Sequence, residues 1–131
     1  MKCLDTTFLI DFLKNDRSAV NKALEIKDDI LITTSVNIFE VLLGIYRKKE
    51  TTKEKLEKFK KLMNNLDILY FDVESSFLAS KITADLINQG KEINAMDCLV
   101  AGTFLSKNCH SIVTRDKEHF QRIKGVKVEG Y

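Results

Sequence analysis

Apolar residues gather in short uninterrupted runs along the chain, and this pattern is typical of buried β-strands. The clearest runs cover residues 30–33, 68–71 and 111–114, which are rich in β-branched or aromatic side chains. Residues 2–4 and 126–128 form weaker runs of the same kind. The sequence therefore predicts about five short strands.

Between these strands, apolar residues recur every three or four positions, which is the spacing of one helix face. Such stripes lie within residues 8–13, 38–45, 56–63, 77–86 and 96–104. Strands that alternate with helices predict crossover connections and a mainly parallel sheet covered on both faces. We expect a fold of the α/β class, built as a three-layer α/β/α sandwich.

The composition narrows the class of protein. The chain has 131 residues, of which 44% are hydrophobic and 31% charged, so we expect a single domain over residues 1–131. Its three cysteines are odd in number and lack CxxC spacing, which argues against a disulfide framework and favours the cytoplasm. Acidic residues interrupt the first apolar stretch, so no signal peptide is expected. No apolar run approaches the roughly 20 residues that span a membrane.

The net charge of +2 says little about partners, but one segment is strongly basic. Residues 47–61 carry eight lysines or arginines against three glutamates. Two interpretations remain open at this point. The segment is either a solvated helix with i,i+4 ion pairs or a surface that contacts nucleic acid phosphates.

Four acidic residues stand out by their position. Asp5 and Asp116 each follow a predicted strand, Asp97 begins a predicted helix, and Glu40 lies inside an otherwise apolar helical segment. In a doubly wound sheet, all four can meet at the edge where strands end. Each also has an ordinary explanation, since the three aspartates can cap helices, as we expect of Asp72, and the glutamate can join a structural ion pair.

Several carboxylates in one place require a counter-charge. Two of them about 4 Å apart repel by about 4 kcal/mol at an effective dielectric of 20, so a cluster needs protons or a divalent cation. Oxygen ligands of this kind suit Mg²⁺ or Mn²⁺ better than zinc. His110, expected to end a helix, and His119, expected on a short polar turn, are not predicted as ligands. Asp11 is expected to face solvent, opposite the apolar stripe of residues 8–13.

Four motifs resemble those of the PIN-domain nucleases, and most closely the small VapC-type toxin ribonucleases. The motifs are Leu4-Asp5-Thr6-Thr7, Ser35-Val36-Asn37-Ile38-Phe39-Glu40-Val41, Ala95-Met96-Asp97-Cys98 and Val113-Thr114-Arg115-Asp116. Each motif is weak alone, but their order and spacing together are specific. The resemblance runs from Lys2 to Val128.

The resemblance implies a homodimeric α/β/α endoribonuclease that holds one or two Mg²⁺ or Mn²⁺ ions. Such an enzyme cleaves RNA with metal-activated water, leaving a 5′-phosphate and a 3′-hydroxyl. The acidic positions of the family match Asp5, Glu40, Asp97 and Asp116. The hydroxyls that orient these carboxylates match Thr6 and Thr114. A small antitoxin protein is the partner that the resemblance implies.

Two positions depart from the family pattern. Thr7 stands where the family often has asparagine or serine, and His119 stands where it often has aspartate, which leaves a single-metal site as an alternative. Candidate contacts to RNA phosphates are Arg47, Lys48, Lys49 and Arg115. For the last of these, pairing with a neighbouring acid is an equal alternative.

Other classes of protein fit less well. A haloacid-dehalogenase-type phosphatase needs a second acid two residues after the first, and Thr7 occupies that position. No glycine-rich phosphate loop of the dinucleotide or P-loop kind is present. A non-cleaving RNA- or protein-binding module and a housekeeping RNA-processing nuclease both remain as alternatives. No dimer surface is predicted, because Phe8, Phe12, Phe39 and Leu43 are all expected in the core.

Overall fold

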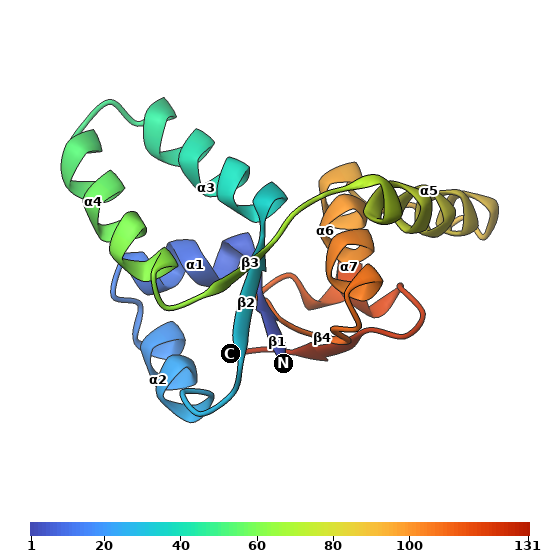
Figure 1. Cartoon of the computed structure of the whole chain (residues 1–131), viewed down its shortest axis with the longest axis horizontal. Helices are drawn as coiled ribbons and strands as arrows, with labels where there is room; N and C mark the ends of the chain where they lie inside the picture. The colour runs from blue at the N-terminus through green and yellow to red at the C-terminus, as the bar shows by residue number, and fades with distance from the viewer.

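The computed structural model describes residues 1–131 as strands and helices that alternate along the chain (Figure 1). The strands are β1 (Lys2–Leu4), β2 (Leu31–Thr34), β3 (Asp67–Leu69), β4 (Ser111–Val113) and β5 (Lys127–Glu129). The helices are α1 (Thr6–Leu13), α2 (Arg17–Glu25), α3 (Ser35–Arg47), α4 (Thr52–Met63), α5 (Val73–Asn88), α6 (Ala95–Ser106) and α7 (Lys117–Gln121).

The five strands form one sheet in the order β3-β2-β1-β4-β5, and every neighbouring pair is parallel. The chain starts at the centre with β1, adds β2 and β3 on one side, and then crosses over to add β4 and β5 on the other. Such a reversal leaves a crevice beyond the carboxyl ends of the central strands, where α/β proteins bind ligands. The predicted parallel sheet of about five strands is confirmed.

Side chains that alternate along the strands build a separate core on each face of the sheet. Cys3, Ile32 and Ile112 pack beneath α5, α6 and α7. Leu4 and Val113, one position further along their strands, pack beneath the helices from α1 to α4. Figure 1 shows the two groups of helices on opposite sides of the sheet, which confirms the three-layer sandwich.

The apolar pattern predicted most elements and missed one. Helix α2 was not predicted, because only Ala19 and Lys22 are buried in it and the apolar stripe that marks the other helices is absent. The strand expected over residues 68–71 spans 67–69 instead, and Tyr70 and Phe71 are exposed. The three cysteines are buried and free. No helix combines the length and the apolar character needed to cross a membrane.

Helix α3 differs from the prediction in the side chains that it buries. Phe8 is buried and Phe12 packs against the same core, as expected. Phe39 and Leu43, however, are 55% and 46% exposed, whereas Val41 on the same helix is buried. The helix is apolar on more than one side, so its periodicity alone did not indicate which face would meet the sheet.

Candidate active site

Asp5 lies at the carboxyl end of the central strand, where β1 turns into α1. Its side chain is only 3% exposed and makes no capping hydrogen bond to the helix, so the cap interpretation fails. Its Oδ2 instead accepts hydrogen bonds from the hydroxyls of Thr114, at 2.7 Å, and Thr7, at 3.2 Å. Its Oδ1 accepts from Nδ2 of the buried Asn37 at 3.2 Å. Three elements therefore fix the orientation of this carboxylate.

Glu40 reaches the same edge of the sheet from the second turn of α3. Its Oε1 accepts a hydrogen bond from the Thr6 hydroxyl at 2.8 Å, and that hydroxyl accepts one from Asn37 Nδ2 at 3.0 Å. The helix begins with a capping box between Thr34 and Asn37. One amide side chain thus links the start of α3 to two of the candidate acids.

Asp97 and Asp116 meet at an imidazole ring. His119 Nδ1 lies 2.9 Å from Oδ2 of both carboxylates. Ligand atoms of these three side chains all lie within 4.8 Å of one another. The expected polar turn at His119 is wrong, because the residue belongs to α7. His110 does not end a helix either, since it is exposed in the segment before β4.

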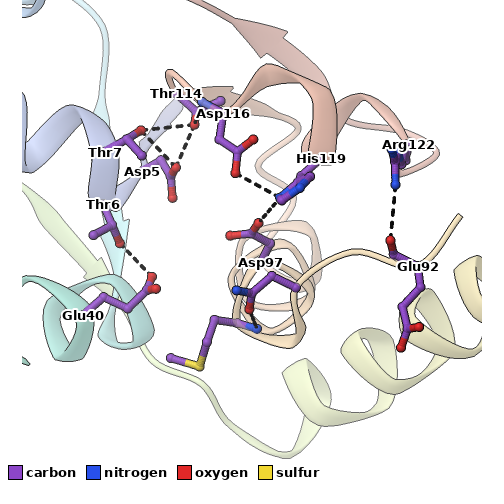
Figure 2. Close-up of polar contacts among 12 residues, drawn as sticks. Asp5, Thr6, Thr7, Glu40, Glu92, Asp97, Thr114, Asp116, His119 and Arg122 are labelled. Atoms are coloured by element: carbon purple, nitrogen blue, oxygen red, sulfur yellow. Dashed lines mark hydrogen bonds and ion pairs between the residues drawn. The ribbon is translucent and has the colours of Figure 1, made fainter.

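Figure 2 shows Asp5, Thr6, Thr7 and Glu40 on one side of the site and Asp97, Asp116 and His119 on the other. Thr6 and Thr114 were predicted to orient carboxylates, and each donates its hydroxyl hydrogen bond to a different acid, Thr6 to Glu40 and Thr114 to Asp5. The amide N–H of Asp116 also donates to the Thr114 hydroxyl at 2.9 Å. The structure thus brings together all four predicted acids and both predicted threonines.

The pKa values of three of the acids are raised, and burial is the largest cause for each. Burial, together with the charges of Asp97 and Glu40, raises the pKa of Asp5 to about 6, although the hydrogen bond from Thr114 acts in the opposite direction. The pKa of Glu40 is raised by burial and by the charge of Asp97. The pKa of Asp97 is raised by burial and by the charge of Asp116, against its contact with His119. Each carboxylate therefore makes its neighbour harder to ionise.

No lysine or arginine side chain forms an ion pair with any of the four acids, so the structural ion pair considered for Glu40 is absent. Their charge is opposed only by hydroxyl and amide donors and by one imidazole. Clustered carboxylate oxygens without a basic partner are the donor set that hard divalent cations prefer. The residues present fit such a cation.

Asp11 was expected to face solvent, and this prediction is wrong. Its side chain is buried, and Oδ2 accepts a hydrogen bond from the Tyr131 hydroxyl at 2.6 Å. The same oxygen lies 3.3 Å from Nη1 of Arg115. Tyr131 comes from the far end of the chain, so sequence spacing gave no sign of this partner. Arg115 thus pairs with a neighbouring acid while most of its side chain stays exposed.

The other three candidate phosphate contacts lie further from the acids. Arg47 ends α3, with Lys48 and Lys49 directly after it, and all three are exposed. The end of α3 is about 10 Å along the helix axis from Glu40, at 1.5 Å per residue. Figure 1 shows this end of α3 pointing away from the sheet. The structure does not bring these residues to the carboxylates.

Sequence reasoning missed the contributions of Asn37 and His119. Asn37 is fully buried and stands three residues before Glu40, on the same face of α3. A polar residue at that spacing inside an apolar segment was a usable signal. His119 stands three residues after Asp116, and the same spacing rule places the two side chains together.

A parallel α/β/α sandwich that gathers four acids at the carboxyl edge of its sheet defines a class of α/β protein whose carboxylates could hold a divalent cation. Within that class, the chain belongs to the PIN domain family, whose sequence model matches residues 2–126. The resemblance drawn from the four motifs is thereby confirmed.

Known proteins agree with this assignment. The chain is 34% identical over 127 residues to Ribonuclease VapC1 of Methanocaldococcus jannaschii, which covers 95% of this chain and 84% of that protein. The fold of this chain is similar to that of a chain in VapBC2 from Rickettsia felis, bound to a promoter DNA fragment. The TM-score is 0.88 at 20% identity, and the match covers 99% of this chain and 98% of that chain. A chain of DNA-bound VapBC from Salmonella typhimurium gives a TM-score of 0.86, 22% identity and coverage of 98% and 96%.

Proposed function

We propose that this chain is a divalent-cation-dependent endoribonuclease with a single PIN domain across residues 1–131, and that Mg²⁺ or Mn²⁺ is the ion. One observation carries the proposal: four carboxylates converge at the carboxyl edge of the sheet without a lysine or arginine partner. The similarity to a ribonuclease over nearly the whole chain supports the same activity.

In this proposal the acids Asp5, Glu40, Asp97 and Asp116 hold one or two cations. A bound divalent cation supplies positive charge for the phosphate and lowers the pKa of water. Thr114 and Asn37 fix the two oxygens of Asp5, and Thr6 fixes Glu40, so the cluster is oriented before a cation arrives.

Basic side chains outside the acid cluster are proposed to bind the RNA backbone. Arg115 directly precedes Asp116 in the chain, and its exposed guanidinium pairs with Asp11, so it is the candidate phosphate contact proposed nearest to the acids. Arg47, Lys48 and Lys49 form a more distant basic surface at the end of α3. Phosphate contacts give affinity without reading the base sequence.

We also propose a small antitoxin protein as partner, which makes the chain the toxin of a pair acting in the cytoplasm. A groove between α1, α3 and α4 is lined by Ile10, Leu13, Val41 and Ile45 and rimmed by Lys48, Lys55 and Lys58, of which Lys58 pairs with Glu54. An apolar floor with a basic rim suits a partner segment that carries apolar and acidic side chains. Two similar folds come from VapBC assemblies. A co-purifying small protein that inhibits cleavage distinguishes this role from that of a housekeeping nuclease.

A second copy of the chain is the partner proposed for an exposed apolar face. Phe39, Leu43 and Tyr46 follow one another at i, i+4 and i+7 on α3, and all three side chains are exposed. Exposed apolar surface of this kind marks association sites. Sedimentation of the wild type against Leu43→Arg tests whether the chain is a homodimer.

The nuclease proposal is tested by cleavage of a mixed pool of single-stranded RNA. Wild-type protein is assayed with Mg²⁺, with Mn²⁺ and with EDTA, beside the variants Asp5→Asn and Asp97→Asn. Asp85→Asn is the matched control, because Asp85 is an exposed acid paired with Lys81 on α5. Circular dichroism confirms that every variant is folded.

We expect cation-dependent cleavage by the wild type and the Asp85→Asn variant, with a loss of at least about 100-fold in the other two. If the folded wild type binds RNA but cuts none of it with either ion, the chain is a non-cleaving RNA-binding module instead. Equal cleavage by Asp5→Asn and the wild type contradicts the proposed site.

A further inference from the structure

We propose that His119 supplies a nitrogen ligand to a cation held with Asp97 and Asp116, and that this ligand makes the site favour Mn²⁺ over Mg²⁺. The inference rests on the proposed function only in requiring that a divalent cation binds. It concerns which ion binds, and it can be tested without RNA.

The observation is the convergence of three donor atoms, from Asp97 in α6, from His119 in α7 and from Asp116 directly before α7. His119 Nδ1 lies 2.9 Å from the nearest oxygen of each carboxylate, and the three side chains can all present donor atoms within 4.8 Å of one another. Figure 2 shows the imidazole pointing between the two carboxyl groups. Neighbouring ligands of an octahedral ion with bonds of about 2.1 Å lie about 3 Å apart, so this spacing suits direct coordination.

Hydrogen bonding alone satisfies these groups poorly. A ring nitrogen carries at most one proton, so His119 Nδ1 can only share that proton between Asp97 and Asp116. Even a protonated imidazole supplies one positive charge against two negative ones. A divalent cation bound by the neutral ring and both carboxylates balances the charge and gives every donor atom a partner.

The chemistry of the nitrogen ligand sets the preference for the ion. Carboxylate and water oxygens suit Mg²⁺, whereas imidazole suits transition-metal ions. Mn²⁺ accepts oxygen ligands and, as a first-row transition metal, nitrogen as well. A site with two carboxylates and one imidazole therefore discriminates against Mg²⁺ more strongly than a site with three carboxylates. The variant His119→Asp creates that comparison at a single position.

The test measures ion binding directly on the full chain in the absence of RNA. Mn²⁺ is titrated by electron paramagnetic resonance, which reports the free ion, and Mg²⁺ is added as competitor. Pulsed measurements on the bound Mn²⁺ then detect coupling to ¹⁴N. His110→Asn is the matched control, because His110 is exposed and is the only other histidine.

We expect ¹⁴N coupling in the wild type and in His110→Asn, replaced by ¹⁵N coupling when the histidines are ¹⁵N-labelled. His119→Asp should lose this coupling and lower the ratio of Mn²⁺ to Mg²⁺ affinity by about tenfold or more, the scale of effect seen when a metal's ligand surroundings change. The labelled wild type decides the question even if the variant fails to fold.

Bound Mn²⁺ without nitrogen coupling, or an affinity ratio that His119→Asp leaves unchanged, overturns the inference. The nuclease proposal survives either result as long as RNA cleavage still requires a cation and Asp97. Absence of any Mn²⁺ binding to the wild type overturns the inference too, and the cleavage assay with EDTA then decides the nuclease proposal separately.

Discussion

At the scale of single residues, Asp5 is the acid whose ionisation the fold opposes most clearly. Burial raises its pKa to about 6, from 3.8 for a free side chain. Between these two pH values the unfolded chain gives up the proton while the folded chain keeps it. The free energy of unfolding contributed by Asp5 therefore falls as the pH rises from about 4 to about 6, and it stays constant above that range.

This behaviour predicts that Asp5→Asn stabilises the cation-free protein. A difference of about two pKa units corresponds to about 3 kcal/mol at neutral pH, and the neutral amide avoids most of that cost. Urea unfolding in EDTA should show the advantage of the variant growing between pH 4 and pH 6 and then levelling off. Added Mn²⁺ should stabilise the wild type more than the variant, because the variant keeps Asp97, Asp116 and His119 but lacks the carboxylate of Asp5. An advantage that is independent of pH contradicts this explanation.

The sequence predicted which acids form the site better than it predicted the residues that these and other acids contact. The positions of Asp5, Glu40, Asp97 and Asp116 followed from strand ends, one apolar segment and the family motifs. The partners of Asp11 could not be predicted, because its contacts with Tyr131 and Arg115 join residues more than 100 positions apart. No role was predicted for Asn37, whose side chain both forms the capping box with Thr34 and donates to Asp5.

At the scale of helices and strands, α5 and α6 pack against each other more extensively than any other pair of helices. A Cβ added to Gly102 on α6 would lie 2.5 Å from the Cβ of Ala79 on α5 and 2.7 Å from its backbone atoms. The glycine therefore lets α6 approach α5. Because Asp97 lies in the first turn of α6, this packing also helps to position that acid.

Gly102→Ala is accordingly expected to destabilise the fold by about 1–3 kcal/mol, the usual range for overpacking a core. Gly44→Ala in α3 is the matched control, since a Cβ there meets no atom within 4 Å. That change should stabilise the helix by about 0.5–1 kcal/mol. Urea unfolding measures the free energy of unfolding of both variants. If Gly102→Ala and Gly44→Ala change it by the same amount in the same direction, Gly102 is not needed for the close approach of α6 to α5.

The sequence predicted elements where apolar periodicity is strong and failed where it is weak. Helices α3 to α6 were visible, but α2 was not, because it buries few residues. Periodicity could not orient α3 or α6, since both are apolar on several sides. For α3, this is why Phe39 and Leu43 were expected in the core although they are exposed. For α6, the pattern gave no sign that Gly102 lies on a buried face.

At the scale of the whole molecule, the order of the strands makes the site. β1 lies between β2 and β4, so Asp5 at the end of β1 meets Thr114 after β4 and Asn37 after β2. The alternating pattern predicted a parallel sheet, and the general rule for such sheets placed ligands where the strand order reverses. The strand order itself could not be predicted from periodicity, because several crossover patterns bury the same stripes.

The central claim is that RNA is cut by hydrolysis that depends on a cation at these acids. The most direct measurement identifies the ends of the fragments that the wild type makes from an RNA of defined sequence, with Mn²⁺ and with EDTA. We predict fragments with 5′-phosphate and 3′-hydroxyl ends, formed only with the cation and not by Asp97→Asn. Fragments with 2′,3′-cyclic phosphate ends, or equal cleavage in EDTA, would contradict the claim, because the 2′-hydroxyl of RNA would then be the nucleophile.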